Sequence, residues 1–177
     1  MLHEIRTYTL LPGKVAEYLR LAEEVSLPIR GNNAGVLVGW WSSELGELNK
    51  LVHVWAWKDL EERQRQRVWL RAQPGWVDAY NPQVDKLVYR REVAILRPEM
   101  PVAPPAQPGN LYELRVYRTH PGKVTPWLDL FKRYLPVRER HSKLVGLWQS
   151  EIGEMNEITL LWAYRDLNAR AAARAGV

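Results

Sequence analysis

The sequence contains no cysteine and only one phenylalanine among its 177 residues. Without cysteine the chain cannot form disulfide bonds, hold a metal through thiolates or use a cysteine nucleophile. No apolar run approaches the roughly 20 residues needed to span a bilayer. The strand-like pattern that begins at Leu2 leaves no room for a signal or transit peptide. These absences predict a soluble, cytoplasmic protein.

A strong excess of charge of one sign is also lacking, because the formal net charge is only +5. The densest basic run, residues 63–71, follows Glu61 and Glu62 on a predicted helix, where ion pairs between residues four apart are expected. Basic and acidic residues are interspersed and no recognition motif accompanies them, so we expect no nucleic-acid partner. Tryptophan, by contrast, is abundant, with nine copies. These large flat side chains favour a filled cavity or interface in which the indole N–H finds a partner.

One stretch of the sequence occurs twice. Residues 43–60 read SELGELNKLVHVWAWKDL, and residues 150–167 read SEIGEMNEITLLWAYRDL. The match continues upstream, where residues 2–8 resemble 111–117 and residues 12–15 resemble 121–124. The chain is therefore a tandem repeat that arose by internal duplication.

The first copy predicts four strands and two helices. Period-two alternation predicts a strand over residues 2–10, a short apolar run predicts one over 36–42, and further strands are expected over 50–57 and 87–96. A period near 3.6 predicts a helix from residue 14, and a second helix is expected from about residue 59 to 72. Asp59 is the expected N-cap of the second helix, and Gly46 and Asn49 are expected at positive φ in the hairpin. The order strand, helix, strand, strand, helix, strand is the split βαβ arrangement of ferredoxin-like domains.

We therefore predict an α+β protein with a first ferredoxin-like unit at 1–98, a Pro-rich linker at 99–109 and a second unit at 110–177. The second unit is predicted to be incomplete, because its pattern supplies a strand, a helix, a hairpin and part of a second helix without the last strand. An uncovered sheet edge is a liability. A homodimer that covers this edge is therefore expected.

Short motifs recur in a fixed order along the first copy. They are EIRTY (residues 4–8), PGK (12–14), LPIR (27–30), GWW (39–41), SELG (43–46), HVW (53–55), PGW (74–76) and ILRP (95–98). In this succession the chain resembles the NIPSNAP family. The second copy departs from the pattern at Leu160, which replaces His53.

The resemblance implies a dimeric α+β barrel, in which two ferredoxin-like sheets stack face to face and helices cover the outside. Other groups that share this barrel include cofactor-independent monooxygenases, haem-degrading enzymes and small isomerases. Extending those activities to this chain is an analogy at the level of the fold.

The strands divide into an aliphatic face and a face of charged and aromatic residues. Because the side of a sheet that helices cover is usually aliphatic, we expect Val52, Val54 and Ala56 beneath the helices. The other face is then expected to meet the second sheet. It carries Glu4, Arg6, Tyr8, His53, Trp55 and Trp57, and in the second copy Glu113, Arg115, Tyr117, Trp162 and Tyr164.

Two interpretations of this face remain open. In one, Glu4–Arg6 and Glu113–Arg115 are structural ion pairs that fix the stacking of the sheets, since buried charges need partners. In the other, they form the polar wall of a pocket between the sheets that binds a small apolar or aromatic ligand.

His53 has two interpretations as well, a hydrogen-bonded core histidine or a general base or iron ligand. We assign His53, Arg6 and Tyr8 as catalytic candidates. The ligand-binding candidates are Glu4, Trp41, Trp55, Trp57, Glu113, Arg115, Tyr117, Trp162 and Tyr164. The four histidines form no recognisable cluster, so we expect no metal site and no cofactor, with haem as an alternative.

Two functions follow from these interpretations. The first is a small-molecule binding protein or a cofactor-independent oxygenase or isomerase that works inside the barrel. The second is a non-catalytic scaffold that acts through protein contacts, with Trp69 and Trp76 as candidates for an exposed aromatic patch.

Overall fold

The computed structural model describes residues 1–102 and 109–176. They form two compact units, Met1–Ile95 and Leu96–Val177. The division falls three residues before the end of the first predicted unit, and part of the predicted linker, residues 103–108, lies outside the described residues.

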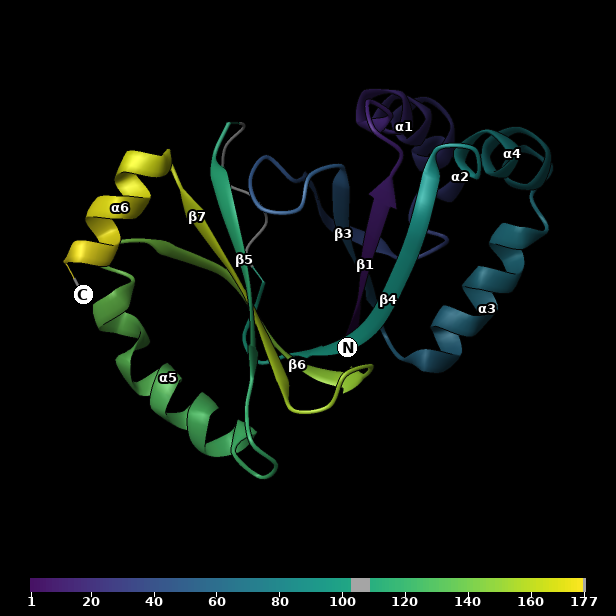
Figure 1. Ribbon diagram of the computed structural model, residues 1–177. Helices are drawn as coiled ribbons and strands as arrows, with labels where there is room; N and C mark the ends of the chain where they lie inside the picture. Colours follow the sequence, from purple (N-terminus) through teal and green to yellow (C-terminus); the bar gives the residue numbers. More distant parts are fainter. Residues whose placement is uncertain (103–108, 177) are drawn as a thin grey trace. The chain divides into compact units, whose positions relative to one another are not determined.

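The first unit contains a sheet in the order β2-β3-β1-β4. Its elements are β1 (Leu2–Leu10), α1 (Val15–Leu21), a first π-helical segment (Ala22–Ser26), α2 (Leu27–Arg30), β2 (Val36–Ser42), β3 (Lys50–Trp57), α3 (Leu60–Arg71), a second π-helical segment (Gly75–Tyr80), α4 (Asn81–Val84) and β4 (Val88–Pro98). Strands β1 and β2 both pair antiparallel with β3. The helices lie on one face of this sheet (Figure 1).

The second unit repeats this plan with β7 at the centre of its sheet. It contains β5 (Leu111–Arg118), α5 (Val124–Arg138), β6 (Lys143–Ile152), β7 (Glu157–Tyr164) and α6 (Leu167–Ala175). Strands β5 and β6 both pair antiparallel with β7, and α5 and α6 lie on one face (Figure 1). Beyond β4, the N–H of Glu99 donates to the carbonyl of Leu147 on β6 at 2.9 Å.

The α+β class and the predicted element order are therefore confirmed. The stacking of two sheets face to face stays a prediction. Within the described residues, no helix has the length and apolar character needed to cross a membrane.

Local details of the two copies coincide. Asn49 (φ 58°) and Asn156 (φ 60°) adopt the left-handed conformation at the end of each hairpin turn, as predicted for Asn49. The carboxylate of Asp59 accepts from the N–H of Glu62 at 2.8 Å, which confirms the predicted N-cap, and Asp166 caps α6 in the same way. The duplicated sequence thus encodes duplicated turns and caps.

A β-bulge lies at the same place in both copies. The register shifts between Leu37 and Gly39 on β2, and between Leu144 and Gly146 on β6. The extra residue reverses which side chains point to each face. As a result Trp40, which lies opposite His53 in register, shares the face of His53, while Trp41 lies opposite Val52 on the other face.

A one-residue difference separates the first helices of the two copies. In the first unit three segments of 7, 5 and 4 residues run from Val15 to Arg30, whereas in the second a single 15-residue helix runs from Val124 to Arg138. The flanking motifs align, so the additional residue falls within Ala22–Ser26, where the helix widens to π geometry. A π-bulge of this kind accommodates an inserted residue and often occurs at a functional site.

The predicted orientation of the first sheet is wrong. Tyr8 and Leu51 pack in one core cluster with Tyr18 and Leu21 of α1, so the charged and aromatic face lies beneath the helices. The physical reason is that the helices supply the partners that this face needs. Arg63 of α3 pairs with Glu4, and Arg30 of α2 stacks on Trp55.

Candidate functional site

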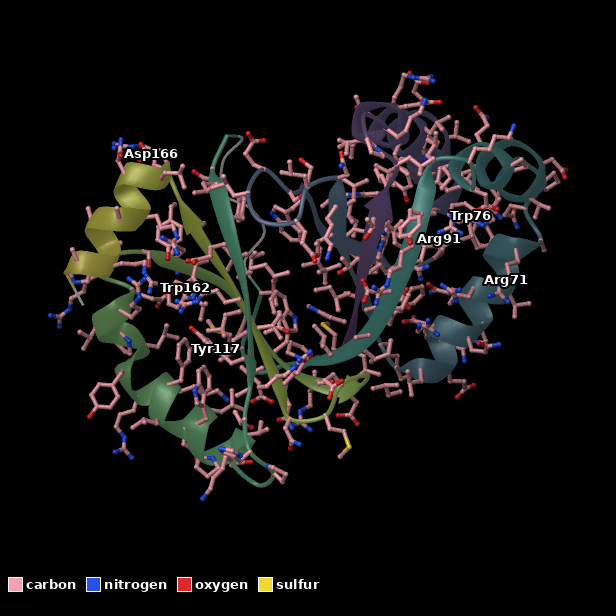
Figure 2. All side chains as sticks on the ribbon, viewed as in Figure 1. Arg71, Trp76, Arg91, Tyr117, Trp162 and Asp166 are labelled. Atoms are coloured by element: carbon pink, nitrogen blue, oxygen red, sulfur yellow. The ribbon has the colours of Figure 1, made fainter. Side chains whose placement is uncertain are left out.

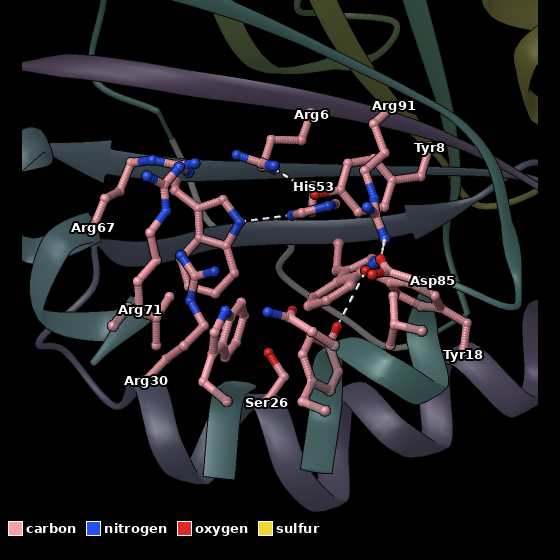
Figure 3. Close-up of a pocket in the computed structure, with 17 residues that line it drawn as sticks. Arg6, Tyr8, Tyr18, Ser26, Arg30, His53, Arg67, Arg71, Asp85 and Arg91 are labelled. Atoms are coloured by element: carbon pink, nitrogen blue, oxygen red, sulfur yellow. Dashed lines mark hydrogen bonds and ion pairs between the residues drawn. The ribbon is translucent and has the colours of Figure 1, made fainter. Parts of the chain in front are cut away.

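A cavity of about 270 Å³ lies between the sheet and the helices of the first unit (Figure 3). The prediction of a pocket between two sheets is therefore wrong for this cavity, because the polar face of the sheet turns toward the helices. The floor is formed by adjacent strands, on which Arg6 of β1 is opposite His53 of β3, and His53 is opposite Trp40 of β2. Three neighbouring strands thus place a cation, an imidazole and an indole in one row.

The opposite wall is formed by the two π-helical segments. Ser26 comes from the first segment, and Trp76 and Tyr80 come from the second. The rings of Trp76 and Tyr80 are 4.7 Å apart, and the hydroxyl of Tyr80 donates to that of Tyr18 at 3.3 Å. Both departures from regular α-helix therefore occur where the helices border the cavity.

Glu4 lies at the end of an ionic network on the same face. Its carboxylate is 1 % exposed and pairs with Arg6 and with Arg63 of α3. Burial alone would raise the pKa of Glu4, but the charges and hydrogen bonds of the two arginines outweigh it and lower that pKa. The predicted Glu4–Arg6 ion pair is confirmed, and α3 completes it with a partner that sequence reasoning missed.

Arg30 is the buried cation at the cavity wall. Its guanidinium lies over Trp55, 3.5 Å from the ring centroid, and 5.6 Å from that of Trp76. One Nη2–H donates to the carbonyl of Ala34 at 2.6 Å, whereas Nε has no partner among the described residues. Burial above all, and then the charge of Arg6, lowers the pKa of Arg30 to about 10, so the side chain still carries its charge at neutral pH.

His53 is held as a neutral imidazole. Its Nδ1 accepts from the indole N–H of Trp55 at 2.6 Å, and the ring of Trp40 stacks on it with centroids 4.4 Å apart. Burial first, then the charges of Arg6 and Arg30, lowers the pKa of His53 well below its ordinary value. A neutral ring whose Nδ1 accepts carries its proton on Nε2. His53 is therefore a hydrogen-bonded histidine with an N–H to donate, and burial beside two cations opposes its use as a base.

Three buried donors of cavity-lining residues lack partners within the described part of the chain. They are Nε of Arg30, Nε2 of His53 and the indole N–H of Trp40. Buried polar groups are nearly always hydrogen-bonded. The site thus presents N–H groups that a ligand or water with acceptor atoms would satisfy.

Within the described residues, no group of three or more histidine, cysteine, aspartate or glutamate side chains is placed so that it could hold a metal ion.

The second unit keeps the framework of this site and loses its polar centre. Arg138 lies over Trp162 at 4.9 Å, as Arg30 lies over Trp55, and Arg170 of α6 pairs with Glu113, as Arg63 pairs with Glu4. The positions of Trp40 and His53 are taken by two leucines, Leu147 and Leu160, which are buried in the core of this unit. The duplicated frame is structural, and the polar centre belongs to the first copy.

The predicted residues of the second unit fall into this structural frame. The hydroxyl of Tyr164 donates to Glu113 and accepts from Arg138, while the guanidinium of Arg115 lies 5.1 Å from the ring of Tyr117. The prediction of a Glu113–Arg115 ion pair is therefore wrong, since Glu113 pairs with Arg170 of α6. Tyr117 and Trp162 lie on the side of the sheet that α5 and α6 cover (Figure 2). Trp162 belongs to the core cluster that includes residues of α5 and α6, and Tyr117 packs against that cluster.

Of the candidates in the first unit, the cavity brings together Arg6, Tyr8, His53 and Trp55. Trp57 is buried against Gly35, and Trp41 crosses over Gly39 on the opposite face, so neither lines the cavity. Sequence reasoning missed Arg30, Trp40 and Trp76. Arg30 is marked by the repeated LPIR and LPVR motifs, which each end in arginine, and Trp40 by its replacement with leucine in the second copy. No comparable signal marks Trp76.

Trp76, one candidate for an exposed patch, instead lines the cavity. Trp69, the other candidate, is 37 % exposed on α3. The two residues therefore do not form one surface patch.

The fold places the chain in a known class of proteins. A monooxygenase-like protein from Lactobacillus acidophilus is similar over 97% of this chain and 80% of its own, with a TM-score of 0.65 and 17% identity, which shows the fold alone. A crystal structure of a NIPSNAP family protein from Agrobacterium tumefaciens is 37% identical, with a TM-score of 0.53 over 55% of this chain and 87% of its own. The class is that of α+β proteins with a monooxygenase-like fold.

The family follows from the sequence comparisons. The NIPSNAP family model matches residues 3–102 and 112–177. Human NipSnap homolog 3A is 30% identical over 177 residues, which cover 97% of this chain and 70% of that protein. The NipSnap homolog of Dictyostelium discoideum is 28% identical over 179 residues, covering 97% of this chain and 73% of the relative. The chain belongs to the NIPSNAP family, which confirms the resemblance.

Proposed function

We propose that the first unit binds a small molecule in the cavity beneath its helices. The observation that supports this most directly is the divergence of the two copies. Where the second copy fills its core with Leu147 and Leu160, the first keeps Trp40 and His53, whose N–H groups lack partners among the described residues. A buried donor without an acceptor costs about 1–3 kcal/mol. The fold of the second copy shows that apolar residues can occupy these positions, so the polar pair serves a ligand.

The geometry favours one kind of chemistry. A neutral His53 N–H and the cation of Arg6 stabilise negative charge that develops on a substrate oxygen, as a preorganised electrostatic site does. Such stabilisation suits an isomerase or a cofactor-independent oxygenase whose substrate develops negative charge on an oxygen atom. The monooxygenase-like relative shares only the fold, so it supports this reaction class by analogy.

Native mass spectrometry of the purified chain, after incubation with a metabolite extract, tests the proposal. We expect one small molecule per chain for the wild type and none for the double variant Trp40→Leu and His53→Leu, which copies the second unit. Circular dichroism establishes that the variant is folded. Equal capture by the wild type and the folded variant would contradict the proposal, as would no capture by either.

A second function, binding through protein contacts, is favoured by the outer face of α5. A groove of about 450 Å³ there is lined almost wholly by apolar side chains, and Leu130 and Tyr134 are 53% and 59% exposed. In the first unit the second π-helical segment packs on the corresponding helix. A contact between two copies through α5 would give a homodimer, although through a helix face and not through the predicted sheet edge.

Light scattering of Tyr134→Glu tests this second function, with Tyr89→Glu as the control because Tyr89 is also exposed, at 76%. A dimer that is lost only in Tyr134→Glu supports it, and an unchanged mass contradicts it. The homodimer, the cytoplasmic location and the absence of a cofactor stay predictions.

A further inference from the structure

We propose that the ligand of this cavity is an organic anion, a planar unsaturated or aromatic carboxylate, and that Arg30 binds its charge. This inference rests on the proposed function and adds the class of the ligand.

The balance of charge around the cavity is strongly positive. Among the described residues, five arginines line it together with one carboxylate, that of Asp85. Asp85 pairs with Arg91, and Glu4 pairs with Arg6 and, at 3.8 Å, with Arg67. Arg30, Arg67 and Arg71 lie together at the end of the cavity away from Asp85 and Arg91 (Figure 3). An anionic group therefore fits at the end that these three arginines form.

Arg30 has the burial, the fixed position and the free donors of an anion-binding group. It is 8 % exposed, is fixed between two indoles and makes no ion pair with a carboxylate among the described residues. A buried cation without a counter-ion is unfavourable, and a carboxylate would supply both charge and acceptor atoms in the fork geometry of the guanidinium. The carbonyl of Ala34 uses only one of its five N–H groups. A neutral ligand would leave the charge uncompensated.

The remaining walls define the body of the ligand. Trp40, Trp76 and Tyr80 present flat aromatic surfaces, which favour a planar partner. The size of the cavity, about 270 Å³, suits one ring or two fused rings. The N–H groups of His53 and Trp40 offer donors to a second acceptor, such as a carbonyl or hydroxyl oxygen on the ring.

Arg138 provides the matched control within the same chain. It stacks on Trp162 as Arg30 stacks on Trp55, but its guanidinium donates to the hydroxyl of Tyr164 and the carbonyl of Ala173. Its neighbours at the equivalent core positions are leucines. A purely structural role for these stacked arginines predicts equal consequences of mutating either one.

Isothermal titration calorimetry with benzoate, benzamide, 2-naphthoate and 2-naphthamide tests the inference. Because hydrogen bonds to charged groups are stronger than neutral ones, we expect each carboxylate to bind about 10- to 100-fold more tightly than its amide. Arg30→Gln is expected to remove this preference while the amides still bind, and Arg138→Gln is expected to keep it. Arg30→Lys keeps the charge without the fork, so its preference should be intermediate.

Amides that bind as tightly as carboxylates would overturn the inference. If the double variant Trp40→Leu and His53→Leu then no longer binds these probes, the small-molecule site itself is still supported. Equal loss of preference in Arg30→Gln and Arg138→Gln would overturn the role of Arg30. No saturable binding of any of the four probes would also overturn the anion class, and native mass spectrometry then judges the site independently. Thermal unfolding of each variant shows that the comparison is made between folded proteins.

Discussion

Replacement of Glu4 by glutamine probes the ionic network that holds the floor of the cavity beneath α3. The carboxylate is 1 % exposed, and its partners Arg6 and Arg63 are 13% and 22% exposed. Removing one member of a buried ion pair costs about 3–5 kcal/mol, because the other charges are left without compensation. Glutamine keeps the shape and one acceptor, and Arg6 also donates to the hydroxyl of Tyr8 at 2.8 Å. We therefore expect Glu4→Gln to lower the free energy of unfolding by about 3 kcal/mol, the lower end of this range.

The same network makes the stability depend on pH. The folded-state pKa of Glu4 lies below its ordinary value of 4.5. The carboxylate therefore adds stability above pH 4.5, and this contribution is lost as the pH falls through the folded-state pKa. The difference between wild type and Glu4→Gln should be full at pH 7 and should shrink below pH 4.5.

Glu113→Gln is the matched control in the second unit. The side chains of Glu113 and Arg170 are 19% and 33% exposed, so solvent screens their attraction and we expect a loss of about 1 kcal/mol. Hydrogen exchange with mass spectrometry measures each unit separately. A loss of about 3 kcal/mol accelerates exchange through the opening of β1 and β3 by about 100-fold. Equal effects of the two substitutions, or a Glu4→Gln effect independent of pH, would refute the reasoning.

Three substitutions and one titration test other features of the structure. Gly39→Ala would place a methyl group 2.2 Å from the ring of Trp41, so it should lower the free energy of unfolding by about 1–3 kcal/mol in urea denaturation. Gly75→Ala meets only the flexible end of an isoleucine at 2.9 Å and should cost less; the reverse order would contradict the packing. By NMR, His53 should be neutral with its proton on Nε2 at pH 6.5, where an ordinary histidine is half protonated, because its pKa is lowered. Its contribution to stability is present above pH 6.5 and is lost as the pH falls below it toward the folded-state pKa. Titration of this ring near pH 6.5 would show that it is not buried beside two cations. Asp59→Ala removes the N-cap of α3 and should cost about 1 kcal/mol in the same denaturation assay, whereas no change would show that the cap is dispensable.

The fold was largely predictable because its signals are local. The turn at Asn49, the cap at Asp59 and the alternation of β1 each depend on a few consecutive residues. The π geometry of residues 22–26 was not expected, although the one-residue offset between the two copies marks it.

The orientation of the sheet could not be predicted from its strands alone. An aliphatic face beneath helices is the usual arrangement, but here Arg63 and Arg30 come from the helices and compensate the charges and indoles of the other face. Arg63, for example, is 59 residues from Glu4 in the sequence and approaches it only in the folded chain. Because the bulge on β2 adds one residue, Trp40 and not Trp41 shares the sheet face of His53.

The nine indole N–H groups offer the most direct test of the central claim, that the cavity beneath the helices of the first unit is the ligand site. Addition of 2-naphthoate to the ¹⁵N-labelled chain should shift the indole resonances of Trp40 and Trp76, which line the cavity, and leave those of Trp127 and Trp162 in place. Shifts confined to Trp127 and Trp162 would place the ligand in the second unit and contradict the claim.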